Sequence, residues 1–474
     1  MNITSIIKSI RDTMRKDAGV DGDAQRISQM VWMLFLKIFA DKEEEWELTI
    51  ESYESPIAEA FKWDAWAADD EGMTGDELME FIDMKLFPAL KEIDTTTSDQ
   101  AKIVKAVFED TYNYMKNGTL FRQVINEINK IDFNSSKDSH VFNDIYETIL
   151  KELQSAGSSG EYYTPRAVTQ FIVDMVNPQL GETVLDPACG TGGFLTCTID
   201  HVRKQVNTPK ATQTLQNSIQ GVEKKPLPHL LCTTNLMLHD FDVPGVRRGN
   251  MLNRPYADWV GKDRVNVVLS NPPFGGTEED GTEKNFPKKF QTKETADLFL
   301  ALIIKILKAD GRAGVVLPDG SLFGEGVKTR IKEELMAKCN LHTIVRLPNG
   351  VFSPYTNIKT NLLFFDKGTK TKDIWFYELP YPDGIKNFNK TRPINIKDFD
   401  DLKKWWTNRT ENEYAWKITA EDIKAKDYNL DSKNPHVAEE NLLSPEELLA
   451  KYQAINNQIQ TLQKSIAQTL SETF

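Results

Sequence analysis

The sequence predicts an α/β protein in which a doubly wound, mostly parallel sheet lies between an all-helical N-terminal domain and a C-terminal helical tail. Three patterns support this prediction. Apolar residues recur at helical spacing near the N-terminus, short apolar runs alternate with helical stretches beyond residue 156, and an apolar seam at helical spacing ends the chain. A length of 474 residues is enough for two to four domains.

The first region, residues 1–155, is expected to be helical throughout, with a loop at 69–75. The helical rhythm is formed by Ile3, Ile6, Ile7, Ile10 and Met14, and later by Ile103, Val107, Tyr112 and Met115. Small residues then accumulate at 155–160, which predicts a linker before the second region.

The second region, residues 156–435, is expected to form the sheet. Six apolar runs are typical of buried strands, and helical stretches separate most of them. These runs are 183–185, 219–222, 265–269, 314–317, 344–345 and 362–365. Strands that alternate with helices favour a doubly wound, mostly parallel sheet.

The third region, residues 436–474, is expected to be a helix with a narrow apolar seam. The seam is formed by Tyr452, Ile455, Ile459, Leu462, Ile466 and Leu470. Such a coiled-coil-like pattern indicates either docking to another subunit or packing on the chain's own domain, and the sequence leaves both open.

The net charge of −13 comes from one window. Residues 41–80 contain fifteen acidic side chains and two basic ones, and the rest of the chain is balanced. We interpret the window as a solvated acidic face. Because no segment is strongly basic, the chain is not expected to bind a phosphate backbone tightly without help.

The cysteine pattern and the apolar content indicate the cellular compartment of the protein. The four cysteines form no C-x-x-C pair and no cluster with the six histidines, which argues against a disulfide framework and against a metal site. No apolar run approaches the ~20 residues of a membrane span, and the first residues lack a signal-peptide pattern. We therefore expect a cytoplasmic protein with no membrane association.

The first chemical motif is a glycine turn between a strand and a helix. The strand ends at Asp186, and the turn Gly190-Thr191-Gly192-Gly193 follows. Glycines allow close backbone approach, and the helix start favours an anionic group. The G-x-G-G spacing after an acid suits the methionine end of S-adenosylmethionine better than a pyrophosphate. Glu223, at the tip of the next strand, can accept hydrogen bonds from both ribose hydroxyls.

The second motif is Asn271-Pro272-Pro273-Phe274, directly after a predicted strand. Two prolines cannot continue a central strand, so the chain leaves the sheet there. The Asn271 side-chain oxygen and the Pro272 carbonyl can accept both hydrogens of an exocyclic amine, and the rigid prolines preorganise these acceptors. Phe274 can stack on the base. Cytosine C5 methylation is excluded, because it needs a cysteine nucleophile and the motif has none.

The region from residue 160 to 365 resembles the modification (methyltransferase) subunit of type I restriction-modification systems, within the γ-type DNA adenine-N6 methyltransferases. The resemblance implies a Rossmann-like, S-adenosylmethionine-dependent sheet. It also assigns cofactor contacts to a segment before the glycine turn, to three residues of that turn, to Glu223 and, for the cofactor's adenine, to Asn250, where many relatives carry Asp. These further residues are Glu161, Tyr162, Tyr163, Thr164, Pro165 and Arg166, and Thr191, Gly192 and Gly193. Residues 351–365 resemble a late motif that helps to hold the target base.

The resemblance implies site-specific methyl transfer to N6 of a flipped-out adenine in double-stranded DNA. It also implies a separate specificity subunit, with two copies of this chain for each copy, and a motor-nuclease restriction subunit. This chain lacks the G-x-x-x-x-G-K-[ST] pattern of a translocase. The lysine- and phenylalanine-containing segment 284–293 is either a clamp on DNA or a solvated loop.

Three other hypotheses remain open. Asn-Pro-Pro-aromatic motifs also serve enzymes that methylate glutamine amides in proteins, which would not need the helical domain. A non-catalytic scaffold that binds the cofactor is a second alternative. N4 of cytosine is an exocyclic amine too, and only the resemblance separates it from adenine N6.

Overall fold

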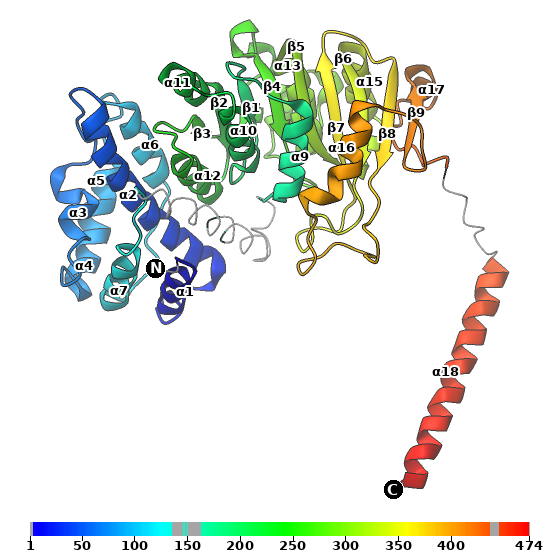
Figure 1. Cartoon of the computed structure of the whole chain (residues 1–474), viewed down its shortest axis with the longest axis horizontal. Helices are drawn as coiled ribbons and strands as arrows, with labels where there is room; N and C mark the ends of the chain where they lie inside the picture. Colours follow the sequence, from blue (N-terminus) through cyan, green and yellow to red (C-terminus); the bar gives the residue numbers. More distant parts are fainter. Residues whose placement is uncertain (1–2, 135–145, 147–148, 150–162, 437–444, 474) are drawn as a thin grey trace. The chain divides into compact units, whose positions relative to one another are not determined.

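The computed structural model describes residues 3–134, 146, 149, 163–436 and 445–473. The chain divides into two units, Met1–Ser432 and Lys433–Phe474. The larger unit contains a helical region and an α/β region (Figure 1). The linker predicted at 155–160 lies outside the described residues.

The helical region is built on α2, whose central turns are buried on all sides. Its Trp32 packs edge-on against Phe87, with ring centroids 5.1 Å apart. Polar caps begin two of its shorter helices, since Ser98 accepts a hydrogen bond from the Ala101 amide and Asn117 from the amides of residues 119 and 120. The helices are α1 (Ile3–Met14), α2 (Gly22–Thr49), α3 (Trp63–Trp66), α4 (Gly75–Phe81), α5 (Phe87–Lys91), α6 (Asp99–Phe108) and α7 (Gly118–Ile128).

The helical rhythm predicted for this region is confirmed at α1 and wrong beyond Phe108. Helix α6 ends there, so Tyr112 and Met115 lie in an irregular segment. Met115 is fully buried while Tyr112 is exposed. Tertiary packing, rather than a continuous apolar face, therefore decides the burial of these two side chains.

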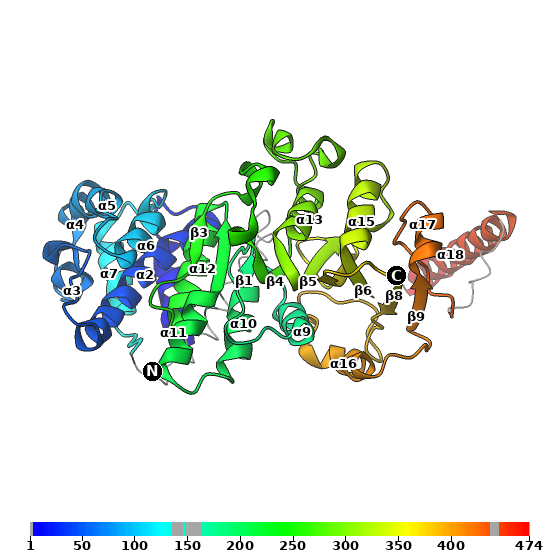
Figure 2. The same ribbon diagram turned by 90° about the horizontal axis from the view of Figure 1, so that it is seen from above.

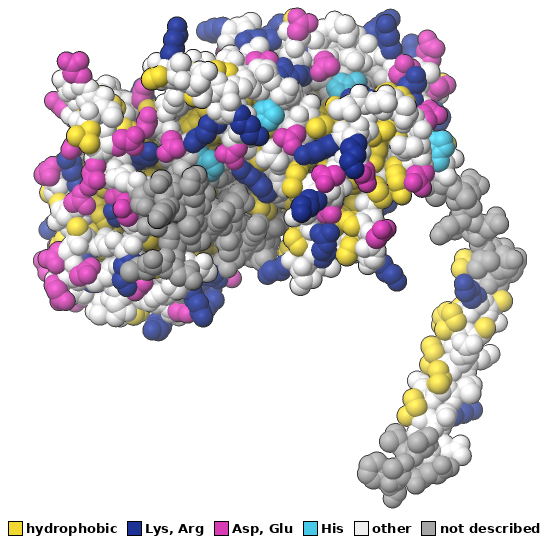
Figure 3. All heavy atoms as spheres, in the orientation of Figure 1, with side chains coloured by type: hydrophobic (Ala, Val, Ile, Leu, Met, Phe, Trp, Pro, Cys, Tyr) yellow, Lys and Arg dark blue, Asp and Glu magenta, His cyan; other side chains and the backbone are white. Residues whose placement is uncertain are grey.

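The acidic window 41–80 is largely solvated, as predicted. Figure 3 shows acidic side chains spread over this part of the surface. Asp41 and Glu43 are the exceptions, because both are buried. Asp41 pairs with Lys37, and Glu43 accepts a hydrogen bond from the Tyr53 hydroxyl at 2.8 Å. Burial raises the pKa of both carboxyls.

The α/β region holds one nine-stranded sheet of order β3-β2-β1-β4-β5-β7-β6-β8-β9. Its strands are β1 (Val184–Asp186), β2 (Ile219–Glu223), β3 (Val246–Arg248), β4 (Val265–Ser270), β5 (Leu307–Pro318), β6 (Cys339–Arg346), β7 (Thr360–Lys367), β8 (Asp373–Glu378) and β9 (Ala415–Thr419). Strand β7 is antiparallel to β5 and β6, and β9 is antiparallel to β8, while the other neighbours are parallel. The predicted mostly parallel sheet is confirmed, whereas β3, β8 and β9 were not predicted.

Helices cover both faces of the sheet. Figure 2 shows α9, α10 and α16 on one face and α13 and α15 on the other. The helices of this region are α9 (Arg166–Val176), α10 (Gly193–Arg203), α11 (Pro209–Ser218), α12 (Pro226–Leu238), α13 (Thr295–Ile306), α14 (Asp319–Phe323), α15 (Val327–Lys338), α16 (Asp400–Thr407) and α17 (Ala420–Ala425). Two apolar clusters, one on each face, hold the layers together.

Helix α12 joins the sheet to the helical region. Leu230 and Leu231 belong to the apolar cluster of the helical region, whereas Cys232 and Leu236 belong to a cluster of the sheet. Near the end of α12, Asp242 accepts a hydrogen bond from the indole of Trp46 at 2.8 Å. The β2–β3 side of the sheet is therefore braced by the helical region.

The second unit contains α18 (Pro445–Thr473), which confirms the predicted C-terminal helix. Its apolar seam is exposed, and Figure 3 shows apolar side chains along the helix. The exposed members include Tyr452, Ile455, Ile459, Leu462 and Ile466, while the side chain of Leu470 lies outside the described set. Among the described helices, none is both long and apolar enough to cross a membrane.

Candidate active site

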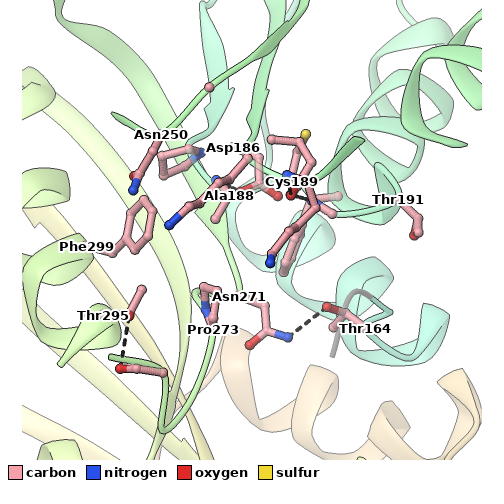
Figure 4. A pocket seen from close by; sticks show the side chains of 18 of the residues that line it. Thr164, Asp186, Ala188, Cys189, Thr191, Asn250, Asn271, Pro273, Thr295 and Phe299 are labelled. Atoms are coloured by element: carbon pink, nitrogen blue, oxygen red, sulfur yellow. Dashed lines mark hydrogen bonds between the residues drawn. The ribbon is translucent and has the colours of Figure 1, made fainter. Parts of the chain in front are cut away.

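A cavity of about 210 Å³ lies where β1, β2 and β4 end. Parallel strands present their carboxyl ends at one edge of a sheet, which is where doubly wound folds bind ligands. Figure 4 shows Cys189 and Thr191 on one side of this cavity and Asn250, Thr295 and Phe299 on the other. Asn271 and Pro273 lie between these two groups.

The glycine turn follows β1 and begins α10. Gly190 and Gly192 have φ of +53° and +85°, a left-handed conformation that side chains disfavour. A Cβ at Gly192 would also lie 2.7 Å from the Cys232 sulfur. Only glycine therefore permits this turn, which brings backbone amides and the start of α10 to the cavity.

Two buried carboxylates flank the turn. Asp186 accepts hydrogen bonds from the Ala188 amide at 3.1 Å and from the Ser270 hydroxyl at 2.8 Å. Burial raises the pKa of Asp186 to about 7. Its carboxyl is therefore poised to respond to a cationic ligand, which would favour the ionised form.

Glu223 forms the tip of β2 and supports the turn directly. Its carboxylate accepts hydrogen bonds from the Gly190 amide at 2.9 Å and from the Lys225 amide at 2.7 Å. Burial raises the pKa of Glu223 as well. Because these two amides occupy only part of its capacity as an acceptor, the carboxylate can still accept hydrogen bonds from a ligand in the cavity.

The side-chain amide of Asn271 makes a hydrogen bond through its nitrogen, while its oxygen makes none with the described residues. Its Nδ2 donates to the Thr164 hydroxyl at 2.9 Å, as Figure 4 shows, and its Oδ1 is buried and has no hydrogen-bond partner among the residues that the structure describes. A buried acceptor without a partner is costly unless a ligand satisfies it. This oxygen is therefore the strongest sign of a bound donor.

The other members of the second motif shape this part of the site. Pro272 is buried and Pro273 lines the cavity. Phe274 is half-buried and packs edge-on against Phe352, with centroids 5.9 Å apart. The chain leaves the sheet directly after Ser270, as the two prolines predicted.

Most of the predicted cofactor residues meet in this one cavity. Those that line it are Thr164, Asp186, Gly190, Thr191, Gly193, Glu223 and Asn250. Gly192 contributes through the turn rather than the lining. Glu161 and Tyr162 lie outside the described residues.

Three residues of the segment before the glycine turn line a different cavity. Tyr163, Pro165 and Arg166 face one of about 540 Å³ beside residues 350–354 and 389–396. The Arg166 guanidinium pairs with Asp200 at 2.8 Å and donates to the Thr196 hydroxyl. Residues 351–365 contribute both to this second cavity and to β7, between β5 and β6.

The two phenylalanines of segment 284–293, which was predicted to be a clamp on DNA or a solvated loop, do not lie at the surface. Phe286 and Phe290 are 3% and 1% exposed and belong to the apolar core. They are therefore unable to stack on a base, and a contact between this segment and DNA stays a prediction that rests on its lysines. The lysines remain at the surface, where Lys289 pairs with Glu334 at 2.7 Å and Lys293 with Asp280 at 2.6 Å.

Sequence reasoning missed several residues of the cavity wall, among them Glu278, Thr295 and Phe299. Glu278 accepts hydrogen bonds from Asn250 Nδ2 at 2.8 Å and from the Thr295 hydroxyl at 3.1 Å. The one available signal was an acidic residue in the glycine-rich segment after Phe274. Among the residues that the structure describes, no group of three or more His, Cys, Asp or Glu side chains is arranged to hold a metal.

Two family models match the chain. The model described as N-6 DNA Methylase matches residues 137–442, and the HsdM N-terminal domain model matches residues 3–128. The first match contains the whole cavity and both motifs. The fold is therefore that of the N-6 DNA methylase class.

Comparison with individual relatives identifies the family within this class. The chain is 56% identical to the type I restriction enzyme EcoEI methylase subunit of Escherichia coli, over 99% of this chain and 98% of that protein. It is 30% identical to the EcoKI methylase subunit of Escherichia coli strain K12, over 87% of this chain and 78% of the relative. A crystal structure of a modification subunit of a putative type I restriction enzyme from Vibrio vulnificus YJ016 superposes with a TM-score of 0.83 at 44% identity, covering 92% of this chain and 97% of that one. The chain belongs to the methylase subunits of type I restriction enzymes.

Proposed function

We propose that this chain transfers a methyl group from S-adenosylmethionine to the N6 amino group of an adenine flipped out of double-stranded DNA. The observation that supports this most directly concerns the Asn271 amide. Its Nδ2 is held by Thr164, and its buried Oδ1 has no hydrogen-bond partner among the described residues. An amino group is the donor that this oxygen lacks.

The residues of the cavity fit the proposed cofactor. The open turn at Gly190 and Gly192 leaves room for a carboxylate at the start of α10, while Asp186 offers a counter-charge to a cation. Glu223 stands at the tip of β2, where ribose hydroxyls bind in nucleotide-binding sheets. When bound, S-adenosylmethionine would supply an electrophilic methyl group.

The chemistry required of the protein is to orient a weak nucleophile. The adenine amino nitrogen is a poor nucleophile because its lone pair is delocalised into the ring. Asn271 Oδ1 and the Pro272 carbonyl would accept its hydrogens and hold the nitrogen nearer to tetrahedral geometry. The stiff proline pair fixes both acceptors before the base arrives, so little reorganisation is needed during the reaction.

The remaining parts of the chain suit a subunit of a larger enzyme. We divide it into a helical domain at 1–155, a catalytic domain at 156–435 and a docking helix at 436–474. Unpaired apolar side chains along α18 support docking to a separate specificity subunit, with two copies of this chain for each copy. A motor-nuclease subunit would supply cleavage.

The experiment is tritiated methyl transfer from S-adenosylmethionine to mixed-sequence duplex DNA, with this chain alone and with its co-encoded specificity subunit. Digestion to nucleosides identifies the product. N6-methyladenine that forms only with the partner is expected, and Asn271→Ala should abolish it while cofactor binding persists. Bound cofactor without any methylated nucleoside would contradict the proposal, and labelling of a protein instead would favour a glutamine substrate.

A further inference from the structure

One end of the cavity is built by Asn250, which the resemblance assigned to the cofactor's adenine, and by three residues that no sequence motif identified. Asn250 follows β3, Glu278 lies in the connection between β4 and α13, and Thr295 and Phe299 lie on α13. Strand β3 lies beyond β2 and Glu223 in the sheet order β3-β2-β1-β4, and the hydrogen bond of Asn250 with Glu278 brings the segment after β4 to the same end of the cavity. A cofactor held by the turn and by Glu223 would therefore extend its base towards Asn250 and Glu278.

Glu278 is held in place by its backbone and by its side chain. Its amide donates to the Lys293 carbonyl at 3.0 Å, and the adjacent Thr277 forms a β-bridge with Glu294. The Thr295 hydroxyl shares its proton between the Gly276 carbonyl at 3.0 Å and one carboxylate oxygen at 3.1 Å, and Asn250 donates to the other carboxylate oxygen at 2.8 Å. The side chain is only 9% exposed, so the carboxylate is a preorganised part of the wall.

Hydrogen bonding at this end of the cavity leaves Glu278 as the strongest acceptor. Asn250 Oδ1 already accepts from the Leu252 amide at 3.0 Å, and Asn250 Nδ2 is turned towards Glu278. The carboxylate uses three of about four acceptor positions, the third with the Lys224 ammonium at 3.4 Å. A charged acceptor forms stronger hydrogen bonds than a neutral amide oxygen. The wall therefore selects a ligand edge that donates.

We propose that Glu278 binds the purine of the cofactor and accepts a hydrogen from its exocyclic 6-amino group, with Asn250 holding the carboxylate in position. This inference rests on the proposed function, because it assumes an adenosine cofactor in this cavity. It adds a specificity: the site selects a 6-aminopurine over a 6-oxopurine. A 6-oxo group carries an acceptor that would face a carboxylate, and that pairing is repulsive.

The test compares the binding of S-adenosylhomocysteine and S-inosylhomocysteine by titration calorimetry, with full-length chain and no DNA. These ligands differ at the 6-position and the adjacent ring nitrogen of the purine. A hydrogen bond to a charged group stabilises by ~1.5–3 kcal/mol, so we expect the wild-type chain to prefer the adenosine ligand about tenfold or more. In Glu278→Gln the side chain can also donate, and the preference should fall to about twofold or less.

Glu279→Gln is the matched control. Glu279 also pairs with Lys224, at 3.0 Å, but its side chain is 73% exposed and outside the cavity lining. It should keep the wild-type preference. Thermal unfolding of both variants distinguishes a loss of discrimination from a loss of fold.

Three outcomes distinguish a failure of the role proposed for Glu278 from a failure of the proposed function. A Glu278→Gln variant that folds and keeps the full preference for the adenosine ligand overturns the role of Glu278. A wild-type chain that binds both ligands equally overturns the predicted purine selectivity while leaving the cofactor site intact. Wild-type chain that binds neither ligand overturns the proposed function itself.

Discussion

Thr164→Val removes the hydroxyl that orients the Asn271 amide while keeping nearly the same shape. In the described part of the chain, the contact from Nδ2 to Thr164 at 2.9 Å is the one hydrogen bond that the Asn271 side chain makes. It fixes which end of the amide enters the cavity. Without the hydroxyl, Nδ2 loses its acceptor, and the two orientations of the amide become similar in energy.

The expected cost follows from that single contact. A neutral hydrogen bond contributes ~0.5–1.5 kcal/mol, and a buried donor left without a partner costs ~1–3 kcal/mol. A loss of about 1.5–2 kcal/mol in the transition state corresponds to a rate about 10–30-fold lower, at 1.36 kcal/mol for each factor of ten. In the proposed function the Asn271 oxygen accepts from the target amine and not from the cofactor, so the effect is expected in the transfer step.

The assay is single-turnover methyl transfer by the assembled enzyme at saturating S-adenosylmethionine, together with cofactor affinity from calorimetry. Thr164→Val should lower the transfer rate by that factor and change the cofactor Kd by less than about threefold. Thr164→Ser keeps the hydroxyl and should restore most of the rate. Thr277→Val removes a different threonine hydroxyl of the same wall and should leave the rate unchanged.

The opposite pattern would refute this reasoning. If Thr164→Val keeps its transfer rate and binds cofactor about tenfold more weakly, the hydroxyl acts on the cofactor and does not orient the amide. A serine variant as slow as the valine variant would show that the methyl group, and not the hydroxyl, matters. Both results are accessible because the rate and the Kd are measured separately.

Three other predictions concern stability, DNA and assembly. Burial raises the pKa of Asp186 to about 7, so the stability of the cofactor-free fold falls as the pH rises from about 4 to 7, and the full loss persists above pH 7. Asp186→Asn should therefore raise the free energy of unfolding at pH 8 by at most about 4 kcal/mol (three pKa units), with a gain that shrinks from pH 7 towards pH 4; denaturant unfolding that shows no gain at pH 8 would contradict this. Lys284 and Lys288 are exposed and have no ion pair among the described residues, so replacing both with Ala should weaken DNA binding by the assembled enzyme and reduce the slope of its salt dependence by about two. An unchanged slope would place DNA elsewhere. Ile459→Asp combined with Leu462→Asp, in the exposed seam of α18, should abolish co-purification with the specificity subunit and leave S-adenosylhomocysteine binding intact, whereas retained co-purification would exclude the seam as the docking surface.

The parts of the site that the strand pattern predicts lie where a strand ends. Asp186, Glu223 and Asn271 each end or follow a parallel strand, and the edge of the sheet brings such residues together whatever their separation along the chain. Glu278 and Thr295 meet for a different reason. The chain between them leaves the wall and returns, closed by the bridge from Thr277 to Glu294. The periodicity of a sequence does not predict such a bridge between two irregular segments.

The segment 284–293 shows how a composition can indicate the wrong environment. Phenylalanines interleaved with lysines favour a surface that contacts nucleic acid, yet Phe286 and Phe290 are buried beside Tyr256. Burying a phenylalanine side chain stabilises the fold by ~1.5–3 kcal/mol, and an exposed ring without a bound ligand does not provide this stabilisation. Lysines tolerate this arrangement, because their charged ends reach solvent from a backbone that is anchored by its apolar neighbours.

Arg166 shows the limit of carrying a motif over residue by residue. Thr164 and Arg166 stand on either side of Pro165, the N-cap of α9, so Thr164 precedes the helix and Arg166 is its first residue. Thr164 reaches the cavity and Asn271, while Arg166 turns to Asp200 on α10. A resemblance fixes where a segment lies; the direction of each side chain depends on the charges and hydroxyls of the neighbouring helix. For that reason the hydrogen bond from Asn271 to Thr164, and not membership of the segment, assigns Thr164 its part in the site.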